Sequence, residues 1–416
     1  MILPVEIIKH ISYFVDESWY PILYYIFHNI LNVPSLNQLN KLLQQASKKG
    51  NENLCQLAKK LGANDFNIML QEAAAIGNSQ LCQLAKKWGA DSFEEMLYKA
   101  AKGGHKHICQ LAKRWGADDF DGMLQGAARK GNEHICQLAK KWGANNFEWM
   151  LIEATKGNHE HICLLAKEWK GRKRFDTGIL SLMCTYAADN GNEYLCCLAK
   201  EWGASDFNNM LDHAASRGNE RLCRLAKEWG ATDFSEMLYA AAHSNRKEFC
   251  YLAKEWGATN FNKMLYGATT AGHKELCELA KKWGATKFDG MLAHAAIHGH
   301  EDLCHLAKEW GATNFNEMLY EATYFNYEHI CRLAKEWGAT EFNRMLQTAT
   351  MKGYKHLCYL AKEWGATNFD EMLRCATRCK DKELCRLARE WKKADNKLRR
   401  RLNPHFQPQT KKRKKQ

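Results

Sequence analysis

The sequence predicts an all-α fold, an α-solenoid of about thirteen copies of one short helix–turn–helix unit. A cysteine recurs every 27 residues, with a single interval of 33 between Cys163 and Cys196. Each unit also carries two apolar stripes with helical spacing, and in most units a glycine follows each stripe. Independent domains are excluded, because one 27-residue hairpin buries too little apolar surface to fold alone.

The cysteines of this series lie at Cys55, Cys82, Cys109, Cys136, Cys163, Cys196, Cys223, Cys250, Cys277, Cys304, Cys331, Cys358 and Cys385.

The unit is clearest at residues 207–233. Its first helix starts at Phe207, after a Ser or Asp able to cap it, and its apolar residues fall at i, i+3, i+4, i+7 and i+8. Gly218 ends this helix, because glycine adopts the left-handed conformation of a helix C-cap without a Cβ clash. A second stripe, from Leu222 to Trp229, predicts the second helix, and another glycine ends it. Two tight turns join the helices.

Three units replace the first glycine with asparagine, at Asn158, Asn245 and Asn326. Asparagine is the next residue to tolerate a left-handed backbone. We therefore expect positive φ angles at these three positions, and the exceptions support the assignment of the turn.

The repeated run L-x-x-A-A-x-x-G-N, which begins at Leu211, resembles the first helix of an ankyrin repeat. The distance from Gly218 to the Gly-Ala pair at Gly230 also matches that family. Two features depart from it: Asn209 and Met210 replace the usual T-P, and six residues are missing where ankyrin repeats form a β-hairpin. The interval of 33 restores the usual length. The resemblance covers most of the chain and implies a scaffold that binds a protein on its concave face, without enzymatic activity.

The sequence motif of the unit, L-A-K-x-W-G-A-T, is also similar to that of ankyrin-type proteins of large DNA viruses. This second resemblance implies a role in host–virus interaction. Ankyrin arrays bind many unrelated partners, so neither resemblance identifies the partner protein.

The cysteine series is interpreted as a set of buried free thiols. Equivalent residues of neighbouring units lie about one helix layer apart, roughly 8–10 Å, which exceeds the Cα separation of about 7 Å that a disulfide allows. Buried thiols indicate a reducing compartment, cytoplasmic or nuclear. The most apolar stretch, Tyr20 to Leu31, is too short to span a bilayer, so no membrane association is expected.

Positive charge is concentrated at the C-terminus. The chain carries a formal net charge of +13, and most of it lies in residues 392–416. We predict three regions: an N-terminal helical cap at 1–38, the repeat array at 39–391 with an insertion at 170–177, and a disordered basic tail at 392–416. The tail is typical of a nuclear-import signal or a nucleic-acid-binding segment; it is also compatible with a purely solubilising role. Its basic runs are Arg399, Arg400, Arg401, Lys411, Lys412, Arg413, Lys414 and Lys415.

The N-terminal segment opens with a helical pattern that resembles an F-box, the motif that docks on a ubiquitin-ligase adaptor. Such a motif would make the protein a substrate adaptor that presents its captured partner for ubiquitination. The alternative is a cap that covers the open apolar edge of the first unit, and one helix could serve both purposes. The residues of the pattern are Leu3, Pro4, Glu6, Ile7, Ile8 and Ile11.

Aromatic residues at the variable positions of the unit are the candidate partner-binding residues. A column of tryptophans, Trp202 to Trp364, repeats too strictly to be a binding site and is interpreted as core packing. The lysines beside it, such as Lys227, are interpreted as a solvated charged face. Tyrosine and tryptophan at variable positions instead match the composition of interface hot spots, although packing between helix ends is the alternative. The candidates are Tyr98, Trp149, Tyr239, Tyr266, Tyr320, Tyr324 and Tyr327.

The insertion contains a basic loop, Arg172, Lys173 and Arg174. It is either a finger that contacts an acidic partner or a phosphate, or a solvated surface loop.

We find no pattern of catalytic, cofactor-binding or metal-binding residues. Cys375, Cys379 and Cys385 lie close together in sequence, but a fourth zinc ligand is not evident. The sequence therefore predicts a non-enzymatic protein-interaction scaffold with an unknown protein partner. The alternative is a nuclear or nucleic-acid-associated protein that acts through its basic tail.

Overall fold

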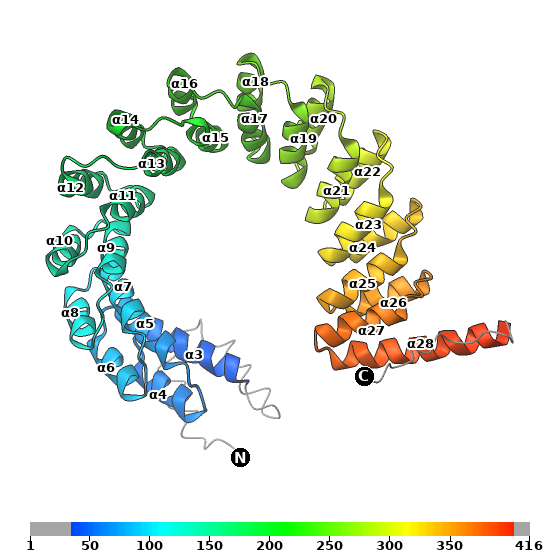
Figure 1. Ribbon diagram of the computed structural model, residues 1–416, viewed down its shortest axis with the longest axis horizontal. Helices are drawn as coiled ribbons and strands as arrows, with labels where there is room; N and C mark the ends of the chain where they lie inside the picture. Colours follow the sequence, from blue (N-terminus) through cyan, green and yellow to red (C-terminus); the bar gives the residue numbers. More distant parts are fainter. Residues whose placement is uncertain (1–34, 403–416) are drawn as a thin grey trace, which may run out of the picture. The chain divides into compact units, whose positions relative to one another are not determined.

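The computed structural model describes residues 35–402, and within this range it contains 26 α-helices and no strand (Figure 1). This confirms the predicted all-α solenoid. The F-box-like residues and the basic run at 411–415 lie outside the described residues. By its internal contacts the chain divides into two larger units, each made of several repeats. The first unit ends at Ser205 and the second begins at Asp206.

The first unit contains α3 (Leu36–Lys48), α4 (Glu52–Lys60), α5 (Phe66–Ala75), α6 (Ser79–Lys87), α7 (Phe93–Gly103), α8 (Lys106–Arg114), α9 (Phe120–Arg129), α10 (Glu133–Trp142), α11 (Phe147–Lys156), α12 (Glu160–Lys170), α13 (Thr177–Asp189) and α14 (Glu193–Trp202).

The second unit contains α15 (Asn208–Arg217), α16 (Glu220–Glu228), α17 (Phe234–His243), α18 (Lys247–Glu255), α19 (Phe261–Thr270), α20 (Lys274–Trp283), α21 (Phe288–His298), α22 (Glu301–Glu309), α23 (Phe315–Tyr324), α24 (Glu328–Glu336), α25 (Phe342–Lys352), α26 (Lys355–Glu363), α27 (Phe369–Arg378) and α28 (Lys382–Leu402).

In each unit the odd-numbered helices form one layer and the even-numbered helices the other. Each odd helix packs against its own even partner and against the next odd helix. An alanine recurs at one position of every odd helix, as at Ala214 and Ala241, and these alanines are fully buried. Within each unit the odd helices line the concave side (Figure 1).

The turns follow the predicted chemistry. Gly218 has φ 75° and ends α15, and Asn158, Asn245 and Asn326 take the same left-handed conformation with φ of 61°, 56° and 68°. The predicted cap of α15 is confirmed, because the Asp206 carboxylate accepts the backbone N–H of Asn208 at 3.0 Å. The helix begins at Asn208, one residue later than predicted.

The cysteine series is buried and free, as the sequence predicts. Burial raises the pKa of Cys136 and of Cys223 to about 12, so both thiols stay protonated and unreactive near neutral pH. In several repeats a buried threonine donates its hydroxyl to a carbonyl one turn earlier and contacts the cysteine. Thr269, for example, bonds Leu265 O at 2.7 Å and lies 3.5 Å from the Cys277 sulfur.

A polar side chain near the start of most odd helices ties each repeat to the next. Asn262 Oδ1 in α19 accepts the backbone N–H groups of Thr286 and Lys287, at 2.9 and 3.0 Å, in the turn before α21. Asp289 repeats this contact with Thr313 and Asn314, at 2.7 and 2.9 Å. These bonds satisfy backbone N–H groups of the turn, which lie outside any helix.

The tryptophan column is only half-buried, so its interpretation as plain core packing is incomplete. Trp283 meets Phe261 edge-on at 5.6 Å, and the ammonium group of Lys254 in the preceding repeat lies 4.4 Å from the centroid of its ring. The same pattern places Lys227 4.6 Å from Trp256. The repeating lysines are therefore not merely a solvated face, because they also join neighbouring repeats by cation–π contacts.

The insertion forms no β-hairpin. Its residues lengthen α12 to Lys170 and add a turn to α13, with a short loop between them. Phe175 in this loop is buried and stacks on Trp202 at 6.0 Å, where other repeats use the first residue of the odd helix. The additional residues of the 33-residue interval are thus taken up by helix and loop.

The predicted boundary of the disordered tail is wrong. Lys392 replaces the glycine that ends the second helix elsewhere, so α28 continues to Leu402 and residues 392–402 are helical. Lys392 also pairs with Asp370 in α27, which joins the start of this extension to the array. At the other end, α3 starts at Leu36 with a Ser35 capping box, slightly before the predicted array.

We predict that Asn262→Ala lowers the free energy of unfolding by about 1–2 kcal/mol, because two turn amides lose their acceptor. Asn262→Asp is the matched control, since Asp289 makes the same contact naturally. Urea unfolding followed by circular dichroism measures both variants. An alanine variant as stable as the parent protein would contradict the role given to this side chain.

Candidate functional site

The variable surface is carried by the odd helices, on the concave side of each unit. The apolar positions that recur in every repeat are buried, and the residues between them, on odd and even helices alike, differ from one repeat to the next. Six of the seven aromatic candidates lie on odd helices, as the sequence predicts. Their surroundings differ, and the differences decide which of them are able to contact a partner.

Two candidates belong to the first unit. Trp149 in α11 is 45% exposed, a large value for a tryptophan. Tyr98 in α7 is half-buried and lies over the next odd helix, where a Cβ built on Gly126 would come within 3.2 Å of its ring. Trp149 is therefore the more accessible aromatic contact of this unit.

In the second unit, two tyrosines stack on histidines. Tyr266 lies 5.0 Å from His294 of the next odd helix, with an angle of 18° between the rings. Tyr239 stacks on His243 one turn further along α17, at 6.1 Å and 23°. Burial raises the pKa of Tyr266 and lowers the pKa of His294, so this stacked pair is uncharged at neutral pH.

The aromatic cluster formed by Tyr320, Tyr324 and Phe325 is the densest on the odd helices. Tyr324 and Phe325 are 37% and 43% exposed, and their rings lie 5.0 Å apart. Cations of the following repeat hold one face of each tyrosine. The Arg344 guanidinium lies 3.8 Å from the Tyr320 centroid, and the Lys352 ammonium lies 3.4 Å from the Tyr324 centroid.

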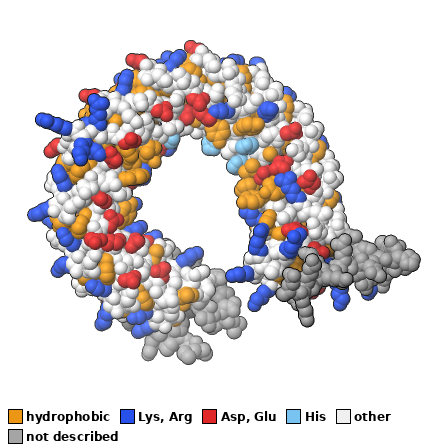
Figure 2. Space-filling model, in the orientation of Figure 1, with side chains coloured by type: hydrophobic (Ala, Val, Ile, Leu, Met, Phe, Trp, Pro, Cys, Tyr) orange, Lys and Arg blue, Asp and Glu red, His pale blue; other side chains and the backbone are white. Residues whose placement is uncertain are grey.

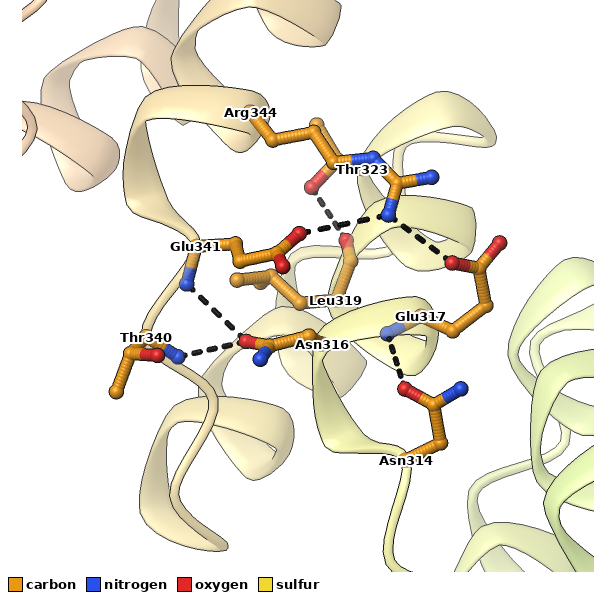
Figure 3. Close-up of polar contacts among 8 residues, drawn as sticks. All are labelled: Asn314, Asn316, Glu317, Leu319, Thr323, Thr340, Glu341 and Arg344. Atoms are coloured by element: carbon orange, nitrogen blue, oxygen red, sulfur yellow. Dashed lines mark hydrogen bonds and ion pairs between the residues drawn. The ribbon is translucent and has the colours of Figure 1, made fainter.

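Arg344 is itself fixed in place (Figure 3). Its Nη1 bonds Glu317 at 3.0 Å and Glu341 at 3.4 Å, so it bridges α23 and the start of α25. Nearby, Asn316 accepts the backbone N–H groups of Thr340 and Glu341 at 2.8 and 3.1 Å. The aromatic cluster thus stands on a rigid polar base that joins two repeats.

Tyr327 differs from the other candidates. It precedes α24, and a Cβ built on Gly299 would come within 2.8 Å of its ring. The ring therefore packs against the preceding repeat. In other repeats a histidine takes this role: His300 Nε2 lies 3.2 Å from the carbonyl oxygen of Thr270. Tyr327 joins two repeats rather than offering a free binding surface.

The candidate basic residues lie in two places, the insertion loop and the end of α28. Arg172, Lys173 and Arg174 are exposed on the insertion loop, and Figure 2 shows Lys and Arg side chains projecting over α12 and α13. Lys170 beside them is instead paired with Glu148 at 2.8 Å. Arg399, Arg400 and Arg401 fall in the last turns of α28.

A pocket that the sequence reasoning missed lies between α15 and α17. It is open, has a volume of about 480 Å³ and is lined by Asp212, His213, Ser216, Glu236, Tyr239, Ala240, His243 and Ser244. Acidic side chains gather over these two helices, with histidines beside them (Figure 2). One signal could have found it: the position of Asp212 carries an acid in no other repeat.

Asp212 is the unusual group of this pocket. Its Oδ1 is buried without a hydrogen-bond partner. Burial, followed by the nearby carboxylates of Glu236 and Asp233, raises the pKa of Asp212 to about 7. Lys263 of α19 acts in the opposite direction, but its ammonium group is bound to Glu236. The pocket therefore holds more negative charge than its own cation balances.

Among residues 35–402, no group of three or more histidine, cysteine or acidic side chains is arranged to hold a metal ion. The three cysteines Cys375, Cys379 and Cys385 thus form no such group. Over the same range, no helix has the length and apolar character needed to cross a bilayer.

No family model matches the chain, and no curated protein matches it. Among solved structures, the chain is similar to one described as a circular tandem repeat protein with novel repeat topology and enhanced subunit contact surfaces. The identity is 18%, with 88% of this chain and 83% of that chain covered, and the TM-score is 0.12. A TM-score this low supports no conclusion about this chain.

We predict that Asp212→Asn stabilises the protein more at pH 8 than at pH 5. The folded-state pKa of about 7 lies above the ordinary value of 3.8, so the folded protein holds a proton that the unfolded chain has already released. The parent protein therefore loses stability, on the order of 2–4 kcal/mol, as the pH rises between these two pKa values. The asparagine variant does not lose it, because asparagine cannot ionise.

Urea unfolding of both proteins at pH 5 and pH 8 measures this effect, and titrations common to both proteins cancel in the comparison. The same difference in stability at both pH values would show that Asp212 ionises normally.

Proposed function

We propose that the protein is a non-enzymatic scaffold that binds a partner protein on the concave, variable side of its helix array. The observation that carries this proposal is the aromatic cluster of Tyr320, Tyr324 and Phe325, in which Tyr324 and Phe325 are exposed and the two tyrosines contact Arg344 and Lys352. Aromatic side chains contribute much of the binding energy at protein interfaces. When they are fixed before binding, less side-chain entropy is lost on association.

The repeat architecture supports the same function. Within each unit the strongest contacts of a repeat are with its neighbours, as in repeat proteins that bind partners over several repeats. Burial raises the pKa of the Cys136 and Cys223 thiols to about 12, which is too high for nucleophilic chemistry at neutral pH, and the exposed variable residues are suited to recognition.

A finer form of the proposal, a substrate adaptor for a ubiquitin ligase, rests on Leu3, Pro4, Glu6, Ile7, Ile8 and Ile11 alone. These residues lie outside the described range, so this role stays a prediction from the sequence.

A second candidate function is nucleic-acid binding through the C-terminal extension. The observation in its favour is that α28 continues beyond the last repeat and carries Lys393 and Lys397 before the arginine run. A helix displays such residues at regular spacing, which suits contact with a phosphate backbone.

We predict that the double variant Tyr324→Ala and Phe325→Ala weakens capture of the partner at least tenfold, because the central aromatic contacts are lost. Affinity purification from the native cell, quantified by mass spectrometry, identifies proteins that the parent chain enriches. Tyr194→Ala is the matched control, since Tyr194 is 49% exposed but lies on an even helix.

Circular dichroism must show both variants folded. Equal capture by the parent protein and the double variant, with partners lost only from the Tyr194 variant, would place binding on the other layer.

For the second candidate, we predict that replacing Arg399, Arg400 and Arg401 with glutamine weakens binding to a duplex DNA probe and reduces its salt dependence. Each lost phosphate contact lowers the slope of log K against log salt by about one. Fluorescence anisotropy at several salt concentrations measures both quantities. The same slope for parent and variant would rule out this part of the tail as a phosphate-binding segment.

A further inference from the structure

The pocket between α15 and α17 is lined by acidic side chains and by no lysine or arginine. Asp212 and Glu236 place two carboxylates in it, one from each helix. Asp233, directly before α17, adds a third negative charge that acts on Asp212. Lys263 is the cation that acts on Asp212, and its ammonium group is bound to Glu236.

Burial of the Asp212 carboxyl is costly without a cation. Its Oδ1 has no hydrogen bond, and an ionised carboxylate that is partly removed from water is destabilised unless a positive charge compensates it. Such a group lowers the stability of the free protein. A positively charged ligand in the pocket would remove this penalty.

The rest of the pocket fits a flat cation. Tyr239 and His243 stack at an interplanar angle of 23° and form an aromatic wall on α17. Ser216 and Ser244 contribute hydroxyl oxygens, which accept N–H groups. Carboxylate, aromatic face and hydroxyl together match a guanidinium, which bonds carboxylates with its planar fork and stacks on rings.

We propose that this pocket receives an arginine side chain of the partner protein. The inference rests on the proposed function, because the arginine is carried by the protein that the concave side binds. A metal ion is a poorer match, since the described residues contain no group of three suitable ligands. The pocket is open to one side, so a side chain presented by a protein surface can enter it.

Arginine binding is coupled to proton release. A guanidinium favours the ionised form of Asp212, so the affinity rises with pH across the pKa of about 7. The expected gain in affinity between pH 6 and pH 8 is about tenfold, because the ionised fraction of Asp212, the form that binds a guanidinium, rises by about that factor. The groups that face the site are Asp206, His213, Asp233, Glu236, Tyr239, His243 and Lys263.

The experiment titrates the full chain with N-acetyl-arginine amide, followed by ligand-observed NMR at pH 6 and pH 8. The uncharged isostere N-acetyl-citrulline amide is the control ligand. We expect binding of the arginine probe that strengthens about tenfold at pH 8, and binding at least tenfold weaker for citrulline. Asp212→Asn should reduce the affinity for the arginine probe at least tenfold and remove most of its pH dependence.

Glu95→Gln is the matched control variant, because Glu95 is exposed and occupies in α7 the repeat position that Glu236 occupies in α17. It should bind the probe as the parent protein does. Equal affinity for arginine and citrulline, or an Asp212→Asn variant that binds arginine unchanged, overturns the inference. These outcomes leave the proposed function intact, because the aromatic cluster is tested separately by partner capture.

Discussion

Close packing between successive odd helices is the constraint on which the rest of each unit depends. The odd helices carry fully buried alanines, such as Ala214 and Ala241, and a larger side chain at these positions would displace a neighbour. The even helices carry tryptophan and lysine, which fill more space. Within each unit the odd helices line the concave side, and they carry most of the candidate residues.

Contacts between neighbouring repeats involve the turns as well as the helices. Asn262 and its equivalents satisfy the turn amides, while Lys254 and Trp283 illustrate the cation–π contact between repeats. These fixed contacts use the same repeat positions each time. The remaining positions are free to vary, and in the second unit they carry the aromatic cluster and the acidic pocket. The scaffold therefore separates the residues that build the array from those available for recognition.

Much of the fold is predictable from the sequence, because the same residue pattern recurs in each repeat. The period, the helices, the left-handed turns at Gly218 and Asn158 and the buried cysteines all follow from local rules. Contacts between repeats were harder to predict from the sequence. The lysine over Trp256, the packing of Tyr327 on Gly299 and the pocket around Asp212 depend on residues about one repeat apart, and hydrophobic periodicity does not register such pairs.

The most direct test removes one whole repeat. Deletion of residues 93–119 joins Ser92 to Phe120 and leaves every neighbour contact with an equivalent partner, whereas deletion of 93–112 breaks the period. The account predicts that the first variant keeps its helical circular dichroism per residue and unfolds cooperatively at a slightly lower urea concentration, while the second loses both properties. Two deletions that are equally damaging would contradict an array held together by interchangeable neighbour contacts.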